Sequence, residues 1–88
     1  MKLLVLCRPR AGVEAAQISA HAADEMVALR ALKQAGTLLE AYSPGGPGAV
    51  LILEEEHSSV QDVLASLPLV QHGLIDTEVI ELHPFVGI

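Results

Sequence analysis

The stretch AVLIL, residues Ala49–Leu53, decides the fold because it contains five consecutive residues without a polar side chain. Successive side chains on a β-strand point to opposite faces, so a strand made of these residues must be covered on both sides. The stretch Leu3–Cys7 is a second run of this kind, and we expect both to be central strands. The stretches 38–42 and 74–83 mix apolar residues with charges, which is typical of edge strands.

The first helical pattern follows the first strand. We expect one long, alanine-rich helix over about residues 13–35, and Gly36 stands where a left-handed residue would end it. At about 100° per residue, one face of this helix is apolar, and that face must pack on the sheet. The apolar face carries Ile18, Ala22, Leu29 and Leu32, with Ala15 and Met26 on its flank.

The second helical pattern precedes the last strand. Ser59, with Asp62 three residues later, resembles a capping box in which Asp replaces Glu. We expect Pro68 to stop this helix and a connector to follow it. The order strand, helix, strand, strand, helix, strand, with the apolar strands central, favours a ferredoxin-like βαββαβ arrangement under the right-handed crossover rule. This is an α+β fold with a four-stranded antiparallel sheet.

Two helices cover only one side of a four-stranded sheet, so the other face is expected to be apolar and open. We expect a second copy of the chain to close it and form a dimeric α/β barrel. The 88 residues are expected to form a single domain, residues 1–88. A domain of this size buries only roughly 60 to 65% of its unfolded surface, so association would add stability.

The charge of the chain argues against two classes of partner. The net charge is −6, and the five basic residues form no patch, which argues against nucleic acid and anionic membranes. The apolar run after Lys2 is about five residues long, shorter than the roughly 7 to 15 of a signal peptide. We therefore expect a cytoplasmic protein. The single cysteine, Cys7, allows no internal disulfide and is expected to be buried and inert.

Glu25 is the most informative residue for function. On the first expected helix it lies about 20° from Ile18, in the middle of the apolar face. An ionised, unpaired carboxylate there would cost several kcal/mol, so it must be paired, wetted by a pocket or protonated with a raised pKa. A carboxylate in an apolar cleft is typical of a general base. The alternative is that Glu25 reaches the helix edge or forms an ion pair with another subunit.

Four further residues are candidates for a site. His21 lies one helical turn before Glu25, where it would orient that carboxylate or carry a proton, unless it is an ordinary packed histidine. Tyr42, on an edge strand, is the only phenol that can donate to a carbonyl. His72 and His83 flank the last strand and are candidates for substrate contacts or surface histidines.

The chain contains no motif for a metal, a nucleotide or a serine nucleophile. Its densest donor groups, His21-x-x-Asp24 and residues 54–57, lack the spacing of a metal-binding motif, so we expect no structural metal. The only glycine cluster lies in the turn over residues 43–48, between two strands, where no helix follows to hold a phosphate.

A series of residues nevertheless resembles the muconolactone isomerase family. The matching positions are Asp24-Glu25, Leu32, Gly36, Ser59-Val60, Leu67-Pro68-Leu69, Asp76, Glu78-Val79, Leu82 and His83-Pro84. The resemblance covers nearly the whole chain and implies a dimeric α+β barrel that often assembles into a decamer. It also implies a cofactor-free enzyme that shifts a double bond in a small unsaturated lactone, with Glu25 as the base.

The stretch 41–48 departs from the family pattern, because the basic and aromatic residues that the family has in its second and third strands to hold a charged lactone have no clear equivalents there. Two alternatives are therefore kept beside the isomerase hypothesis. The first is a non-catalytic module for small-molecule binding or oligomerisation. The second is another cofactor-free member of the same barrel superfamily, such as a YCII-type protein or a small monooxygenase.

Overall fold

Four strands form one antiparallel sheet in the computed structural model, which describes residues 1–88. The spatial order is β2-β3-β1-β4, so the two apolar strands are central and the two charged strands are edges, as predicted. The strands are β1 (Lys2–Pro9), β2 (Leu38–Tyr42), β3 (Ala49–Glu54) and β4 (Ile75–Glu81).

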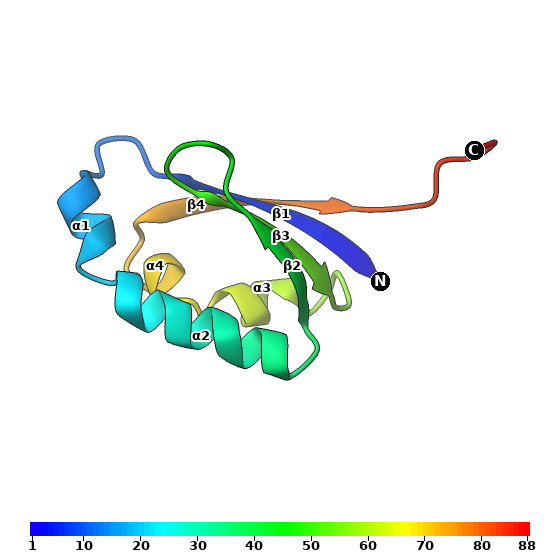
Figure 1. The fold of residues 1–88 in the computed structure, drawn as a ribbon, viewed down its shortest axis with the longest axis horizontal. Coiled ribbons are helices and arrows are strands. Elements are labelled where there is room, and N and C mark those ends of the chain that lie inside the picture. The colour runs from blue at the N-terminus through cyan, green and yellow to red at the C-terminus, as the bar shows by residue number, and fades with distance from the viewer.

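The helices all lie on one side of this sheet, and no segment of the chain covers the other side (Figure 1). They are α1 (Ala15–Ser19), α2 (Ala22–Gln34), α3 (Val60–Leu64) and α4 (Pro68–Gln71). With β1 in the centre between β3 and β4, this is the ferredoxin-like α+β arrangement that the sequence predicts. None of the helices is both long enough and apolar enough to cross a bilayer.

The prediction of one long helix over residues 13–35 is wrong in one respect, because the chain turns between α1 and α2. The His21 N–H donates to the carbonyl of Ile18, three residues back, at 3.1 Å, and His21 itself leaves the helical conformation (φ −114°, ψ 6°). Alanine favours helix on both sides of this turn, so no local breaker marks it. Gly36, with φ +82°, ends α2 as predicted.

The second helical region also differs from the prediction. Ser59 precedes α3 but makes no side-chain capping hydrogen bond, so the expected capping box is not formed. Pro68 does not stop a helix; it occupies the first turn of α4, after an extended Leu67 (φ −84°, ψ 126°). Proline fits the first helical position because its fixed φ is already helical and no N–H is needed there.

The hydrophobic core fills the space between the sheet and the helices. Along β1, side chains alternate as expected: Leu3, Val5 and Cys7 are buried, whereas the residues between them point to the uncovered face. The largest fully buried side chains are Leu3, Val5, Leu51, Leu53, Val60, Leu64 and Leu67.

The uncovered face of the sheet carries a continuous apolar patch. In the pairing registers, Leu4 lies opposite Ile52 and Ile80, and Leu6 lies opposite Val50. Ile80 is 42% exposed, and the other four are only half-buried because nothing from the chain covers them. Apolar patches of this kind mark interaction surfaces. We call these five residues the open-face patch.

Candidate active site

Glu25 is the only buried charged residue of the protein, with 9% of its surface exposed. It lies in α2 on the side that meets the sheet, which confirms the position inferred from helical periodicity. One carboxylate oxygen, Oε1, accepts a hydrogen bond from the backbone N–H of Leu69 at 3.0 Å. Leu69 belongs to α4, so this contact joins two helices that are distant in the sequence.

The electrostatics of Glu25 are set by burial and by this backbone amide. Burial raises the pKa of the Glu25 carboxyl above its usual value, and the Leu69 N–H offsets part of that rise by favouring the ionised form. No Lys, Arg or His forms an ion pair with it. Within its own chain, Glu25 therefore has no ionic partner.

A cavity of about 270 Å³ lies beside Glu25, between α2 and the end of the sheet. Its walls are mostly apolar: Cys7, Pro9, Ile18, Met26, Leu29, Pro47, Gly48, Ala49, Leu51, Leu69 and Ile75 complete the lining. The Oε2 atom of Glu25 has no hydrogen-bond partner. Every side-chain oxygen that is fully sealed from solvent does have a partner, so Oε2 is not sealed. Oε2 is therefore the oxygen available to a molecule in the cavity.

Cys7 is the only other lining residue whose side chain carries an exchangeable proton. Its burial, reinforced by the nearby Glu25 carboxylate, raises the pKa of the thiol to about 11. The thiol is therefore protonated at neutral pH and is not a nucleophile, as the sequence analysis expected. Its weak S–H donor faces the same cavity as Glu25.

His21, which was expected near Glu25, lies next to His72, which was expected to flank the last strand. The rings of His21 and His72 stack with their centroids 4.0 Å apart and their planes 20° apart. His21 immediately precedes α2 and His72 immediately follows α4. Neither ring lines the Glu25 cavity, so the structure brings these residues close to the site without placing them in it.

Tyr42 lies on a different surface from Glu25. It pairs with Val50 on the uncovered face of the sheet, and its hydroxyl donates to the carboxylate of Glu40. That hydrogen bond raises the pKa of the Tyr42 phenol. Tyr42 is 55% exposed, so it is available to another molecule on that face.

The far end of β4, at Glu81, lies roughly 20 Å along the strand from the cavity-lining Ile75 at about 3.4 Å per residue, and His83 lies beyond that end. There His83 and His57 both contact Glu81, at 3.4 and 2.7 Å. The His57 hydrogen bond holds the pKa of Glu81 below its usual value. The structure thus separates His83 from Glu25.

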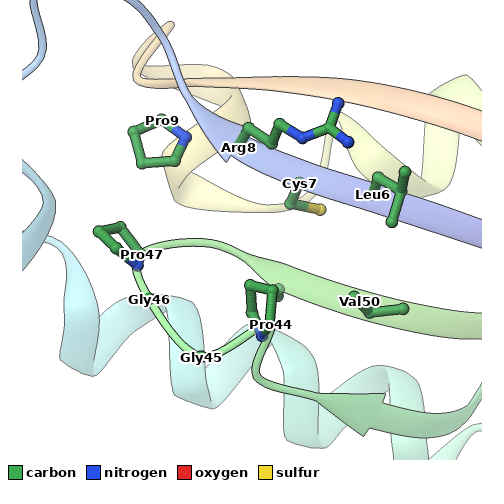
Figure 2. Close-up of a pocket in the computed structure, with 10 residues that line it drawn as sticks. Leu6, Cys7, Arg8, Pro9, Pro44, Gly45, Gly46, Pro47 and Val50 are labelled. Carbon is green, nitrogen blue, oxygen red and sulfur yellow. The ribbon is translucent and has the colours of Figure 1, made fainter.

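A second hollow, of about 560 Å³, opens on the uncovered side of the sheet beside the turn 43–48 (Figure 2). Pro9 and Pro47 face each other across one end of it, and Arg8 is its only charged lining residue. It shares four lining residues with the Glu25 cavity, so the two spaces adjoin around the end of the sheet. The shared residues are Cys7, Pro9, Pro47 and Ala49.

Sequence reasoning missed three features of this site. Arg8 follows the buried Cys7 in β1, and neighbouring side chains of a strand point to opposite faces. Strand periodicity could therefore have placed Arg8 on the open face. Cys7 was expected to be buried, but nothing local showed that it would share a cavity with Glu25. The Leu69 amide had no sequence signal at all, because a backbone N–H is present at every residue except proline.

The architecture defines the class of protein: an α+β domain of the muconolactone isomerase-like fold. Among solved structures, the chain is similar to muconolactone isomerase, with a TM-score of 0.77 and 21% identity over 100% of this chain and 94% of that chain. It is also similar to 5-chloro-2-hydroxyhydroquinone dehydrochlorinase from Burkholderia phenoliruptrix, solved in complex with 2,5-dihydroxybenzoquinone. For this second structure the TM-score is 0.73, with 22% identity over 94% of each chain. No protein-family model and no curated protein sequence matches the chain.

Proposed function

We propose that this protein is a cofactor-free, isomerase-like enzyme that moves a proton within a small unsaturated lactone or a related carbonyl acid. The observation that carries the proposal is a buried carboxylate, Glu25, with a free oxygen in an apolar cavity. The two similar structures add support, because one is an isomerase and the other a dehydrochlorinase solved with a small quinone. Both names describe reactions on small oxygenated ring compounds.

The proposed reaction requires one base and no change in oxidation state. The Glu25 carboxylate takes the proton from the carbon beside a carbonyl, and the electrons of that C–H bond pass to the carbonyl oxygen as an enolate. The enolate is conjugated with the neighbouring double bond. Glu25, now protonated, returns the proton to the far end of the conjugated system, so the double bond moves and the carboxylate is regenerated.

The surroundings of Glu25 suit this role. Because burial raises its pKa, the carboxylate is a stronger base than an exposed one, while the Leu69 N–H keeps it oriented and favours its ionised form. The Cys7 thiol, protonated at neutral pH, is the one side-chain donor available to the oxygen of a bound carbonyl. A cavity of about 270 Å³ is at the small end of ligand-binding sites, which favours a small substrate.

The other residues expected from the sequence take different places in this proposal. His21 and His72 lie beside the site, where they act on Glu25 rather than on the substrate. Tyr42 and His83 are separated from the cavity of their own chain, so any contact they make with a substrate requires a second copy. We assign Tyr42 to the contact between two copies, because it borders the open-face patch.

Homodimer formation through the open-face patch is part of the proposal. The chain leaves Leu4, Leu6, Val50, Ile52 and Ile80 without cover on one side of the sheet, whereas the helices cover the other side. A second copy would bury this patch against its own equivalent, as a two-fold symmetric interface requires. Such a dimer would also narrow the hollow beside Arg8, which lies on the same face.

The test is a screen of small unsaturated lactones by ultraviolet absorbance, followed by kinetics of a Glu25→Gln variant. Gln retains the shape and accepts the Leu69 hydrogen bond but cannot take a proton, so kcat should fall at least about 10²-fold. Glu56→Gln, on the exposed turn after β3, is the matched control and should keep the wild-type rate. Turnover by Glu25→Gln at the wild-type rate would remove Glu25 from the mechanism.

A non-catalytic binding module is the rival hypothesis. It predicts that lactones bind, as seen by a change in thermal stability or by calorimetry, while no compound in the screen is converted. In that case Glu25→Gln would change affinity alone. The wild-type screen distinguishes the two hypotheses before any variant is made.

A further inference from the structure

Helices α2 and α4 contact each other at two levels around the candidate site. At the first level, the Leu69 N–H donates to Glu25 Oε1 at 3.0 Å. At the second level, the rings of His21 and His72 stack at 4.0 Å. His21 precedes Glu25 by one helical turn, and His72 follows Leu69 by about one turn, so the two contacts are adjacent steps between the same pair of helices.

The backbone ties each histidine to the Glu25 contact. The N–H of Glu25 donates to the carbonyl of His21 at 2.9 Å, and the N–H of His72 donates to the carbonyl of Pro68, beside Leu69, at 2.9 Å. Both histidines are therefore fixed to the turns of helix that carry the carboxylate and its amide donor. A shift of either ring would move one partner of the Leu69–Glu25 hydrogen bond.

The apolar side chains of α4 are only partly buried, with Leu69 and Val70 packed against the edge of the core. The helix has four residues, and none of its side chains is fully buried. A single short turn of helix is not stable by itself, so its position depends on tertiary contacts. The stack at its C-terminal end and the carboxylate at its N-terminal end are the two contacts with α2 that involve defined polar or aromatic groups.

We propose that His21 and His72 are positioning residues, whose stacked rings hold α4 against α2 and so keep the Leu69 amide on the Glu25 carboxylate. This role differs from proton transfer or substrate contact, because neither ring lines the cavity. It needs two flat rings in contact rather than titratable nitrogens. Its catalytic consequence rests on the proposed function, whereas its structural consequence does not.

The consequence for Glu25 follows from what the amide does. The Leu69 N–H is the group that favours the ionised carboxylate against the effect of burial. If α4 moves away, Glu25 loses both this amide and the cover that Leu69 gives the carboxylate, so its titration changes. The only other titratable side chain in the cavity, Cys7 on β1, is a neutral thiol at neutral pH and does not replace the amide.

The experiment uses two alanine variants, His21→Ala and His72→Ala, and two phenylalanine variants of the same residues. Carbon-13 NMR of the Glu25 side-chain carboxyl gives its titration, and hydrogen exchange gives the protection of the Leu69 amide. Each alanine variant should change the titration of Glu25 and speed Leu69 exchange at least about tenfold. Each phenylalanine variant retains a stacked ring and should behave like the wild type.

Two controls make the outcome decisive. His57→Ala removes an exposed histidine at the far end of the sheet and should change neither quantity. If one alanine variant does not fold, the other removes the same stack from the opposite helix. Wild-type Leu69 protection and Glu25 titration in an alanine variant would overturn the proposal, as would phenylalanine variants that behave like alanine. Because these readouts need no substrate, they stand even if Glu25→Gln shows that the proposed function is wrong.

Discussion

The carboxylate of Glu25 in α2 and the backbone nitrogen of Leu69 in α4 lie 3.0 Å apart. This hydrogen bond pairs the only buried charged side chain of the protein with a backbone amide instead of a basic side chain. An amide orients a carboxylate without neutralising its charge, so the group remains able to accept a proton. The contact is therefore the structural basis of the proposed chemistry and of the first prediction.

Glu25→Gln should change how stability depends on pH. Since the pKa of Glu25 is raised in the folded protein, its stabilising contribution is complete below the ordinary value of 4.5 and is lost as pH rises through the folded pKa. Glutamine stays neutral throughout. Urea unfolding should show the variant gaining stability relative to the wild type between pH 4 and pH 7.5. A difference that does not vary with pH would contradict this prediction.

Val50→Glu should break the proposed dimer. Val50 lies in the open-face patch, so a second copy would bury the new carboxylate at the contact and raise the dimer dissociation constant at least about 100-fold. Val27→Glu is the matched control, since Val27 is 65% exposed on α2, away from the sheet. Sedimentation velocity measures both variants. A wild-type protein that sediments as a monomer at tens of micromolar would rule out the dimer.

Leu67→Ala should destabilise the fold strongly. Leu67 is fully buried where α3 gives way to α4, and removal of its side chain leaves a cavity that costs about 2 to 5 kcal/mol. Leu39→Ala, at a position that is 38% exposed on β2, should cost less than about 1 kcal/mol. Denaturant unfolding followed by circular dichroism measures both. Equal losses would show that α4 does not seal the core.

Gly48→Ala should be more harmful than Gly45→Ala, although both glycines have a positive φ. A Cβ at Gly48 would lie 2.3 Å from the carbonyl oxygen of Cys7, whereas a Cβ at Gly45 would meet open space. Backbone atoms cannot rotate away, so the clash should cost at least about 1 kcal/mol beyond the strain common to both variants. Thermal unfolding of the pair checks this. Equal midpoints would mean that the turn adjusts freely.

Some features of this protein are fixed by local sequence. The apolar stretches Leu3–Cys7 and Ala49–Leu53 require cover on both faces, and they are the central strands of the sheet. Helical periodicity places Glu25 on the buried side of α2, and it is buried there. These predictions succeed because a buried face of a strand or helix requires apolar residues at a regular spacing along the sequence.

Other features were decided only by tertiary structure. The turn at His21 that separates α1 from α2 has no strong local signal, and Pro68 is compatible with either the end or the start of a helix, so both features depend on how these segments pack. The contacts that define the site, Leu69 with Glu25 and His72 with His21, join α4 to α2. Periodicity reports which side of an element is buried, whereas only the packed fold determines which distant atoms meet there.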